Sequence, residues 1–162
     1  MVPMSVLGLG WCPHTGWSVV FVGLESGRQL KIGVPLRDAL ILGSELIGQR
    51  TERSALYELV CALIDQPMHG ACVQLAPAEE GRVQAALVLS PKDPRIAYPT
   101  PIADAVTVAG RARLPIFVDD ALVEQFGIGG EPRPDHVGNA ELAEATVPLA
   151  FHRALGGAVD DD

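Results

Sequence analysis

The sequence predicts an α+β fold made of two similar units, each with three strands followed by helices that pack on a mixed sheet. One observation is an internal register of 66 residues, in which the stretch 35–39 falls without a gap on 101–105, with Pro and Asp-Ala at matching places. A second is the order of the patterns, because β-rich runs separated by turn signals precede apolar helical runs in both halves. A long internal period is typical of a duplicated supersecondary unit.

The first unit, residues 3–66, is predicted to hold three strands and two helices. The strands are expected at 5–10, 17–24 and 28–34, and the helices at 36–47 and 51–65. The first helix follows Pro35, a residue that suits a helix start because its missing N–H is not needed there. The second is expected to begin at Thr51, an N-cap candidate, and to end before Pro67.

The second unit, residues 69–131, repeats this order with one additional short strand. Strands are expected at 71–76, 82–89, 95–98 and 114–118, and helices at 102–113 and 120–126, the latter capped by Asp119. Residues 127–139 are rich in Gly and Pro and predict a linker. We therefore expect a folded domain over residues 1–128 and an acidic linker and tail over residues 129–162.

The charge distribution disfavours a nucleic-acid binder that relies on neutralising phosphates. The net charge is −8, and residues 119–162 hold ten acidic and two basic residues, so residues 1–118 are neutral. A basic footprint is therefore absent from the sequence. The helices expected at 36–47 and 102–109 are apolar on nearly all sides, which predicts a homo-oligomer because a domain of this size has little interior.

The cysteines and the apolar runs indicate a cytoplasmic protein. Three cysteines without a CxxC pair are typical of a reducing compartment. No apolar run is long enough for a membrane span, and the N-terminal residues do not resemble a secretion signal. An alternative use of the thiols is a tetrahedral zinc site, for which the candidate ligands are Cys12, His14, His69 and Cys72.

Asp38 and Asp104 are the main candidates for a functional site. In one interpretation they stabilise helix N-termini through the helix dipole. In the other, carboxylates at duplicated positions of two apolar helices face one cleft, where they bind a divalent cation such as Mg²⁺ or Ca²⁺ or divide acid and base roles. The candidates for binding phosphate are Arg37, Arg50 and Arg53, whose alternative role is that of solvated charges at helix ends.

Residues 3–128 resemble the bifunctional nuclease domain family. The resemblance is carried by VLGLG, WSVVFVGL, LKIGVPLRDA and ADAVTVAGRARLPIFVDDALVEQFGI. It implies a duplicated α+β fold, a homo-oligomer and hydrolysis of DNA or RNA phosphodiesters. It also implies that Asp38, in place of the family's usual Glu, and Asp104 are the catalytic acids.

The chain departs from the family pattern at two places. The Arg of the family's Arg-Pro-Ser-Asp-Ala motif is missing from the stretch 100–105, and Ser54-Ala55 stand where the family has His-Asp. These departures favour two alternatives to a nuclease. One is a protein that binds or converts a small molecule between its halves, and the other is an oligomeric interaction protein.

Overall fold

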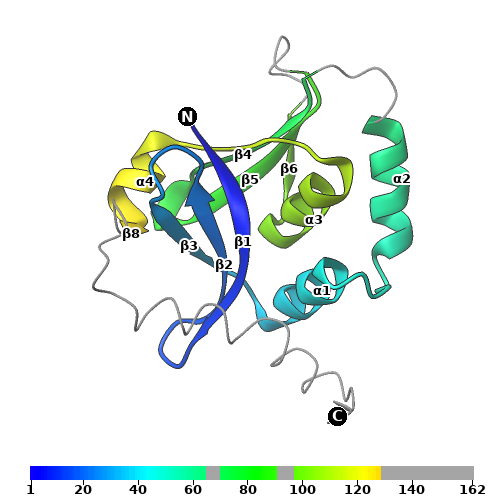
Figure 1. The fold of residues 1–162 in the computed structure, drawn as a ribbon, viewed down its shortest axis with the longest axis horizontal. Helices are drawn as coiled ribbons and strands as arrows, with labels where there is room; N and C mark the ends of the chain where they lie inside the picture. Colours follow the sequence, from blue (N-terminus) through cyan, green and yellow to red (C-terminus); the bar gives the residue numbers. More distant parts are fainter. Residues whose placement is uncertain (65–69, 91–96, 129–162) are drawn as a thin grey trace.

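The computed structural model describes residues 1–64, 70–90 and 97–128, and it confirms the predicted α+β class (Figure 1). Within these ranges eight strands form one mixed sheet in the order β6-β5-β4-β7-β1-β2-β3-β8. The strands are β1 (Val2–Cys12), β2 (Gly16–Gly23), β3 (Gln29–Gly33), β4 (Cys72–Pro77), β5 (Val83–Val88), β6 (Ala97–Thr100), β7 (Ile116–Val118) and β8 (Gly127–Ile128). The helices are α1 (Leu36–Leu46), α2 (Ser54–Ile64), α3 (Ile102–Ala112) and α4 (Asp120–Phe126), with a 3-10 turn at Glu79–Gly81.

The sheet consists of two antiparallel meanders joined by one central strand. β1, β2 and β3 form the first meander, and β4, β5 and β6 form the second. β7 lies between them, parallel to β4 and antiparallel to β1. The sequence predicts this strand but not its position. Its place between β4 and β1 joins the two meanders into one continuous sheet over one core.

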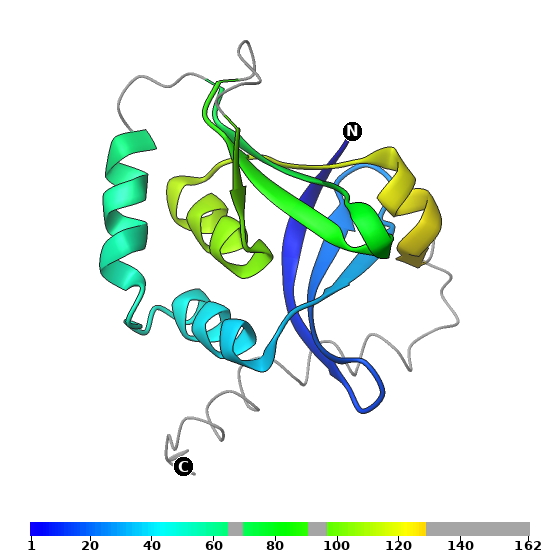
Figure 2. The same cartoon turned by 180° about the vertical axis from the view of Figure 1, so that it is seen from behind.

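The helices cover the sheet unequally. Figures 1 and 2 show α1, α2 and α3 together on one side of the sheet and α4 on the other. α3 contacts α1, α2, β4 and β5, whereas α4 contacts β3 and β4. A single cluster of buried apolar side chains fills the space between these layers, with Phe21, Leu42 and Leu75 fully buried.

α1 and α3 begin directly after Pro35 and Pro101, as predicted. Neither proline has a side-chain cap, and both have the extended backbone that a proline ring favours before a helix. α3 does not need a second protomer to bury its apolar faces, in contrast to what was predicted for it, whereas α1 keeps Leu36 and Leu46 exposed. Residues 103 and 105–109 of α3 are buried within one chain, because α3 is covered by two helices and by the sheet.

Two element boundaries differ from those predicted. α2 begins at Ser54 instead of Thr51, because the backbone N–H of Thr51 donates to the Ser54 hydroxyl and the chain makes a turn before the helix. Residues 127–128, expected in the linker, pair with β3 as a short edge strand. The remainder of the predicted linker and the tail at 129–162 lie outside the described residues.

In the part of the chain that the structure describes, no helix has the length and apolar character required to cross a membrane.

Candidate functional site

Asp38 and Asp104, the third residues of α1 and α3, are brought together by Arg53. Nη1 of Arg53 is 2.7 Å from Oδ1 of Asp104 and 3.3 Å from Oδ1 of Asp38. The three side chains are between 21% and 25% exposed, so the ion pairs are largely shielded from water. The two carboxylates therefore share one guanidinium, which joins the turn before α2 to the N-terminal ends of α1 and α3.

Tyr57, which was not predicted as a site residue, completes this cluster. Its hydroxyl donates to Oδ1 of Asp104 at 2.6 Å, and the residue is 2% exposed. Burial, together with the hydrogen bond to the Asp104 carboxylate, raises the pKa of Tyr57 to about 12, so the phenol remains a donor at neutral pH. The signal in the sequence was its place four residues after Arg53, since residues so spaced meet on one side of a helix.

Asp104 is expected to matter more for stability than Asp38, although the two occupy matching positions in the sequence. Asp104 accepts two close hydrogen bonds, whereas among the described residues Asp38 has only the longer contact to Arg53. We expect Asp104→Asn to lower the free energy of unfolding by about 1–2 kcal/mol and Asp38→Asn by less than about 1 kcal/mol. Urea denaturation of both variants measures this difference, and equal losses would contradict it.

A second polar cluster lies at the opposite end of α1, around Glu45. Its side chain is 2% exposed, and the Nε of Arg111 in α3 donates to Oε2 at 3.0 Å. The hydroxyls of Thr51 and Ser54 donate to Oε1 at 2.7 and 2.5 Å. Each carboxylate oxygen is thus satisfied, and the cluster ties the end of α1 to α3 and to the turn before α2.

The charge of Glu45 is stabilised in the folded state. Burial by itself raises the pKa of Glu45, but the hydrogen bonds from Ser54, Thr51 and Arg111 outweigh burial and lower the pKa below its ordinary value. The neighbouring carboxylate in turn raises the pKa of Arg111. The sequence carried a signal for this pair, because positions 45 and 111 hold opposite charges and are aligned by the 66-residue register.

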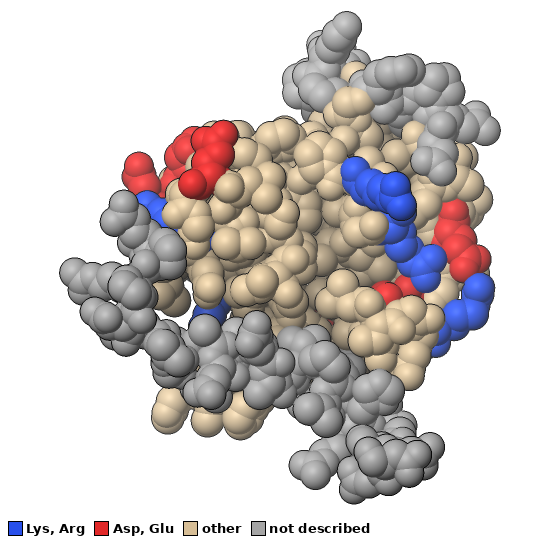
Figure 3. Space-filling model, in the orientation of Figure 1, with Lys and Arg blue, Asp and Glu red and all other residues tan. Residues whose placement is uncertain are grey.

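Arg37 and Arg50, which were predicted to bind phosphate, each pair with a glutamate. Arg37 is 2.5 Å from Glu52, and Arg50 is 2.9 Å from Glu58. Both arginine side chains are at least 70% exposed, which matches their alternative role as solvated charges. Figure 3 shows basic and acidic side chains next to one another on the side of the molecule where α1, α2 and α3 gather.

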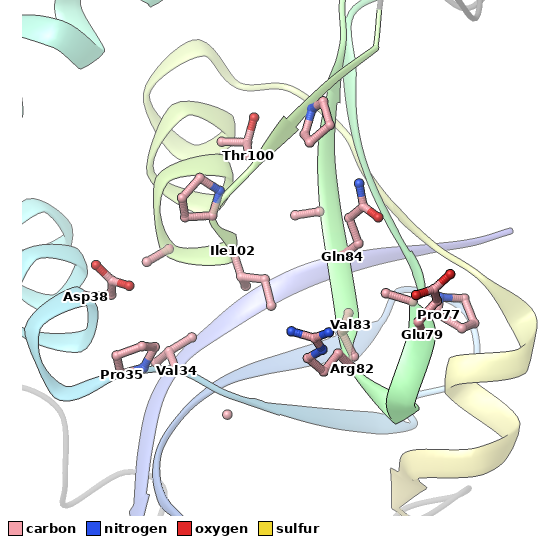
Figure 4. A pocket seen from close by; sticks show the side chains of 16 residues that line it. Val34, Pro35, Asp38, Pro77, Glu79, Arg82, Val83, Gln84, Thr100 and Ile102 are labelled. Carbon is pink, nitrogen blue, oxygen red and sulfur yellow. The ribbon is translucent and has the colours of Figure 1, made fainter.

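A groove of about 870 Å³ lies beside the first cluster, between the N-terminal ends of α1 and α3 and strand β5. Asp38 lines it at one end, and the turn that carries Glu79 and Arg82 lines it at the other (Figure 4). Gln84 and Thr100 are further polar groups of the lining. The rest is mainly apolar and includes four prolines, Pro35, Pro77, Pro99 and Pro101, whose rigid backbone gives the groove a fixed rim.

The structure does not bring the candidate zinc ligands Cys12 and Cys72 together. Through β7, Met4 of β1 lies level with Val73 of β4, and Cys12 is eight residues further along β1, or about 26 Å at 3.3 Å per residue. His69 lies outside the described residues. Cys12 and Cys72 form no disulfide, and burial raises the pKa of the Cys72 thiol.

The aspartate pair, as arranged, does not fit a divalent cation. A cation held by both carboxylates would have to displace the Arg53 guanidinium, which contacts an oxygen of each. Among the described residues there is also no group of three or more His, Cys, Asp or Glu side chains placed to bind a metal. We therefore derive no chemical step through a metal at this site.

Comparison with known proteins gave no match, either to a protein-family model or to a curated protein.

Proposed function

We propose that this protein binds a small molecule in the groove between the N-terminal ends of α1 and α3, on the fold of a divergent member of the bifunctional nuclease family. The observation that carries this proposal is the groove itself. Its volume of about 870 Å³ lies within the range of known ligand pockets, and its lining combines apolar side chains with polar and charged ones.

The lining defines the chemistry of the ligand. The proline and aliphatic side chains suit a flat apolar body. Arg82 is the basic residue of the lining and shares its turn with the acid Glu79, while Asp38 and Gln84 offer oxygens to hydrogen-bond donors. A 5′-mononucleotide combines these features, so adenosine monophosphate is a suitable first probe.

The proposed kinship rests on the sequence resemblance and on the arrangement of the two units. Glu45 contacts Arg111 directly, and Asp38 meets Asp104 through Arg53, so both clusters join positions 66 residues apart. Contacts between equivalent positions are what a two-fold axis between α1 and α3 would produce. The two meanders also have the same strand order. These features support the internal repeat, and the thiols of Cys12 and Cys72, which form no disulfide, support a cytoplasmic location.

Binding can be tested by blocking the groove at Gly33. A Cβ added at Gly33 meets open space, so Gly33→Leu should fold normally and fill part of the groove. We expect adenosine monophosphate to raise the melting temperature of the native protein, since a ligand at about 100 times its Kd adds about 2.7 kcal/mol. The rise should be lost in Gly33→Leu.

Gly110→Leu is the matched control for this experiment. A Cβ at Gly110 also meets open space, but Gly110 lies on α3 outside the groove, so this variant should keep the full rise. A rise that survives in Gly33→Leu would mean that the nucleotide binds elsewhere. No rise at millimolar nucleotide would contradict the proposed ligand class.

Phosphodiester hydrolysis is the second candidate, favoured by an acid in the groove that is linked to a second acid beside it. Asp38 lines the groove, and Arg53 links it to Asp104. Single-stranded DNA and RNA oligonucleotides, incubated with Mg²⁺ or Ca²⁺, test this activity. Cleavage that Asp104→Asn abolishes would support it, and binding that is absent even at low salt would exclude it.

A further inference from the structure

α2 has two apolar faces, and only one of them is covered. Ser54, Tyr57 and Ile64 are buried, at a spacing that places them on the side that packs on α3. The opposite side consists of five exposed residues, which we call the leucine face: Ala55, Leu56, Leu59, Ala62 and Leu63. The three leucines are 57–58% exposed. Figures 1 and 2 show α2 at the outer edge of the molecule, away from the sheet.

The leucine spacing is that of a helix–helix seam. Leu56, Leu59 and Leu63 follow one another at intervals of three and four residues, which is the pattern of the a and d positions in a coiled coil. Ala55 and Ala62 flank the seam with small side chains, so a second helix can approach closely. Single exposed leucines need no explanation, but an ordered stripe of three on one helix marks an interaction surface.

The charges around this face favour an identical partner. Glu58 is the only charged residue of α2, and it faces Arg50 at 2.9 Å and Arg111 at 3.9 Å instead of belonging to the leucine face. Two copies of the chain, each with a net charge of −8, can therefore meet at α2 without opposing like charges at the contact. An antiparallel pair of identical helices also places equal spacings opposite one another, as two-fold symmetry requires.

We propose that the leucine face is the contact of a homodimer in which α2 packs against α2 of a second copy. The size of the face sets the expected strength. An α2 of 11 residues is about 16 Å long, and a pair of such helices covers less than the roughly 800 Å² per partner of a standard interface. The dimer should therefore be weak, with a dissociation constant in the micromolar range.

The test is sedimentation velocity of the full chain from about 1 µM to about 100 µM, the range in which a micromolar dimer forms. We expect the native protein to shift from monomer to dimer, and Leu59→Glu and Leu59→Lys to stay monomeric. An equimolar mixture of the two variants should recover dimer, because opposite charges then face one another near the two-fold axis. Leu24→Glu, a substitution at an equally exposed leucine between β2 and β3, should dimerise like the native protein.

Two results would overturn the proposal. One is a native chain that stays monomeric throughout, because the leucine face would then have another partner or none. The other is a Leu59→Glu variant that dimerises as well as the native protein, because the contact would then lie elsewhere. Circular dichroism and melting temperature show whether each variant is folded, and Leu63→Gln serves as a milder second variant should Leu59→Glu fail to fold.

Discussion

Arg53→Met is expected to lower the free energy of unfolding by about 2 kcal/mol at pH 7, below the 3–5 kcal/mol of a fully buried pair because the groups are partly exposed. The methionine keeps most of the apolar stem but removes the charge that Asp38 and Asp104 share. The two carboxylates then face one another without the guanidinium between them, and of the two described side-chain donors to Asp104 the hydroxyl of Tyr57 remains. Urea denaturation measures the loss.

A second substitution distinguishes charge repulsion between Asp38 and Asp104 from lost packing. Adding Asp38→Asn to Arg53→Met should restore part of the loss at pH 7.

Arg37→Met is the matched control for Arg53→Met. Arg37 also pairs with a carboxylate, that of Glu52, but the Arg37 side chain is 72% exposed. We expect a change within about 0.5 kcal/mol, as for most surface ion pairs. If both variants lose the same stability, Arg53 is an ordinary surface charge and the cluster does not hold the three helices together.

Glu45→Gln is expected to lower the free energy of unfolding by about 2 kcal/mol at pH 7, because hydrogen bonds to a charged group contribute more than neutral ones. The amide is nearly the same size, so packing is preserved while Arg111 loses its anionic partner. Glu58→Gln is the control, since Glu58 also pairs with an arginine but is 46% exposed. Its loss should be below about 1 kcal/mol.

The effect of Glu45→Gln should depend on pH in one direction. The folded-state pKa of Glu45 is lowered, so the stabilisation from its charge is present above the unfolded pKa of about 4.3. It is lost as pH falls from there through the lower folded-state value. The difference between the native protein and Glu45→Gln should therefore shrink in acid, and a difference that stays constant would show that shape and not charge is responsible.

The sequence by itself determined the elements and their order. Alternating apolar residues, turn signals such as Ser26-Gly27, and the prolines before α1 and α3 act locally, so they could be interpreted without knowing what packs against them. The cap at Asp119 is of the same kind, because its side chain accepts from the nearby N–H of Ala121 at 2.9 Å. The 66-residue register also singled out Asp38 and Asp104 before their neighbours were known.

The tertiary structure decided which residues those aspartates meet. An arginine is cationic both in solution and in a cluster, so the sequence could not show that Arg53 lies between two carboxylates instead of binding phosphate. It also could not show which apolar helix is covered, since α1, α2 and α3 all have apolar residues on more than one side. The insertion of β7 at the centre of the sheet and the packing of α3 between α1 and α2 bury α3 and leave the leucine face of α2 exposed. Burial is a property of what surrounds a residue, and that is fixed only when distant segments meet.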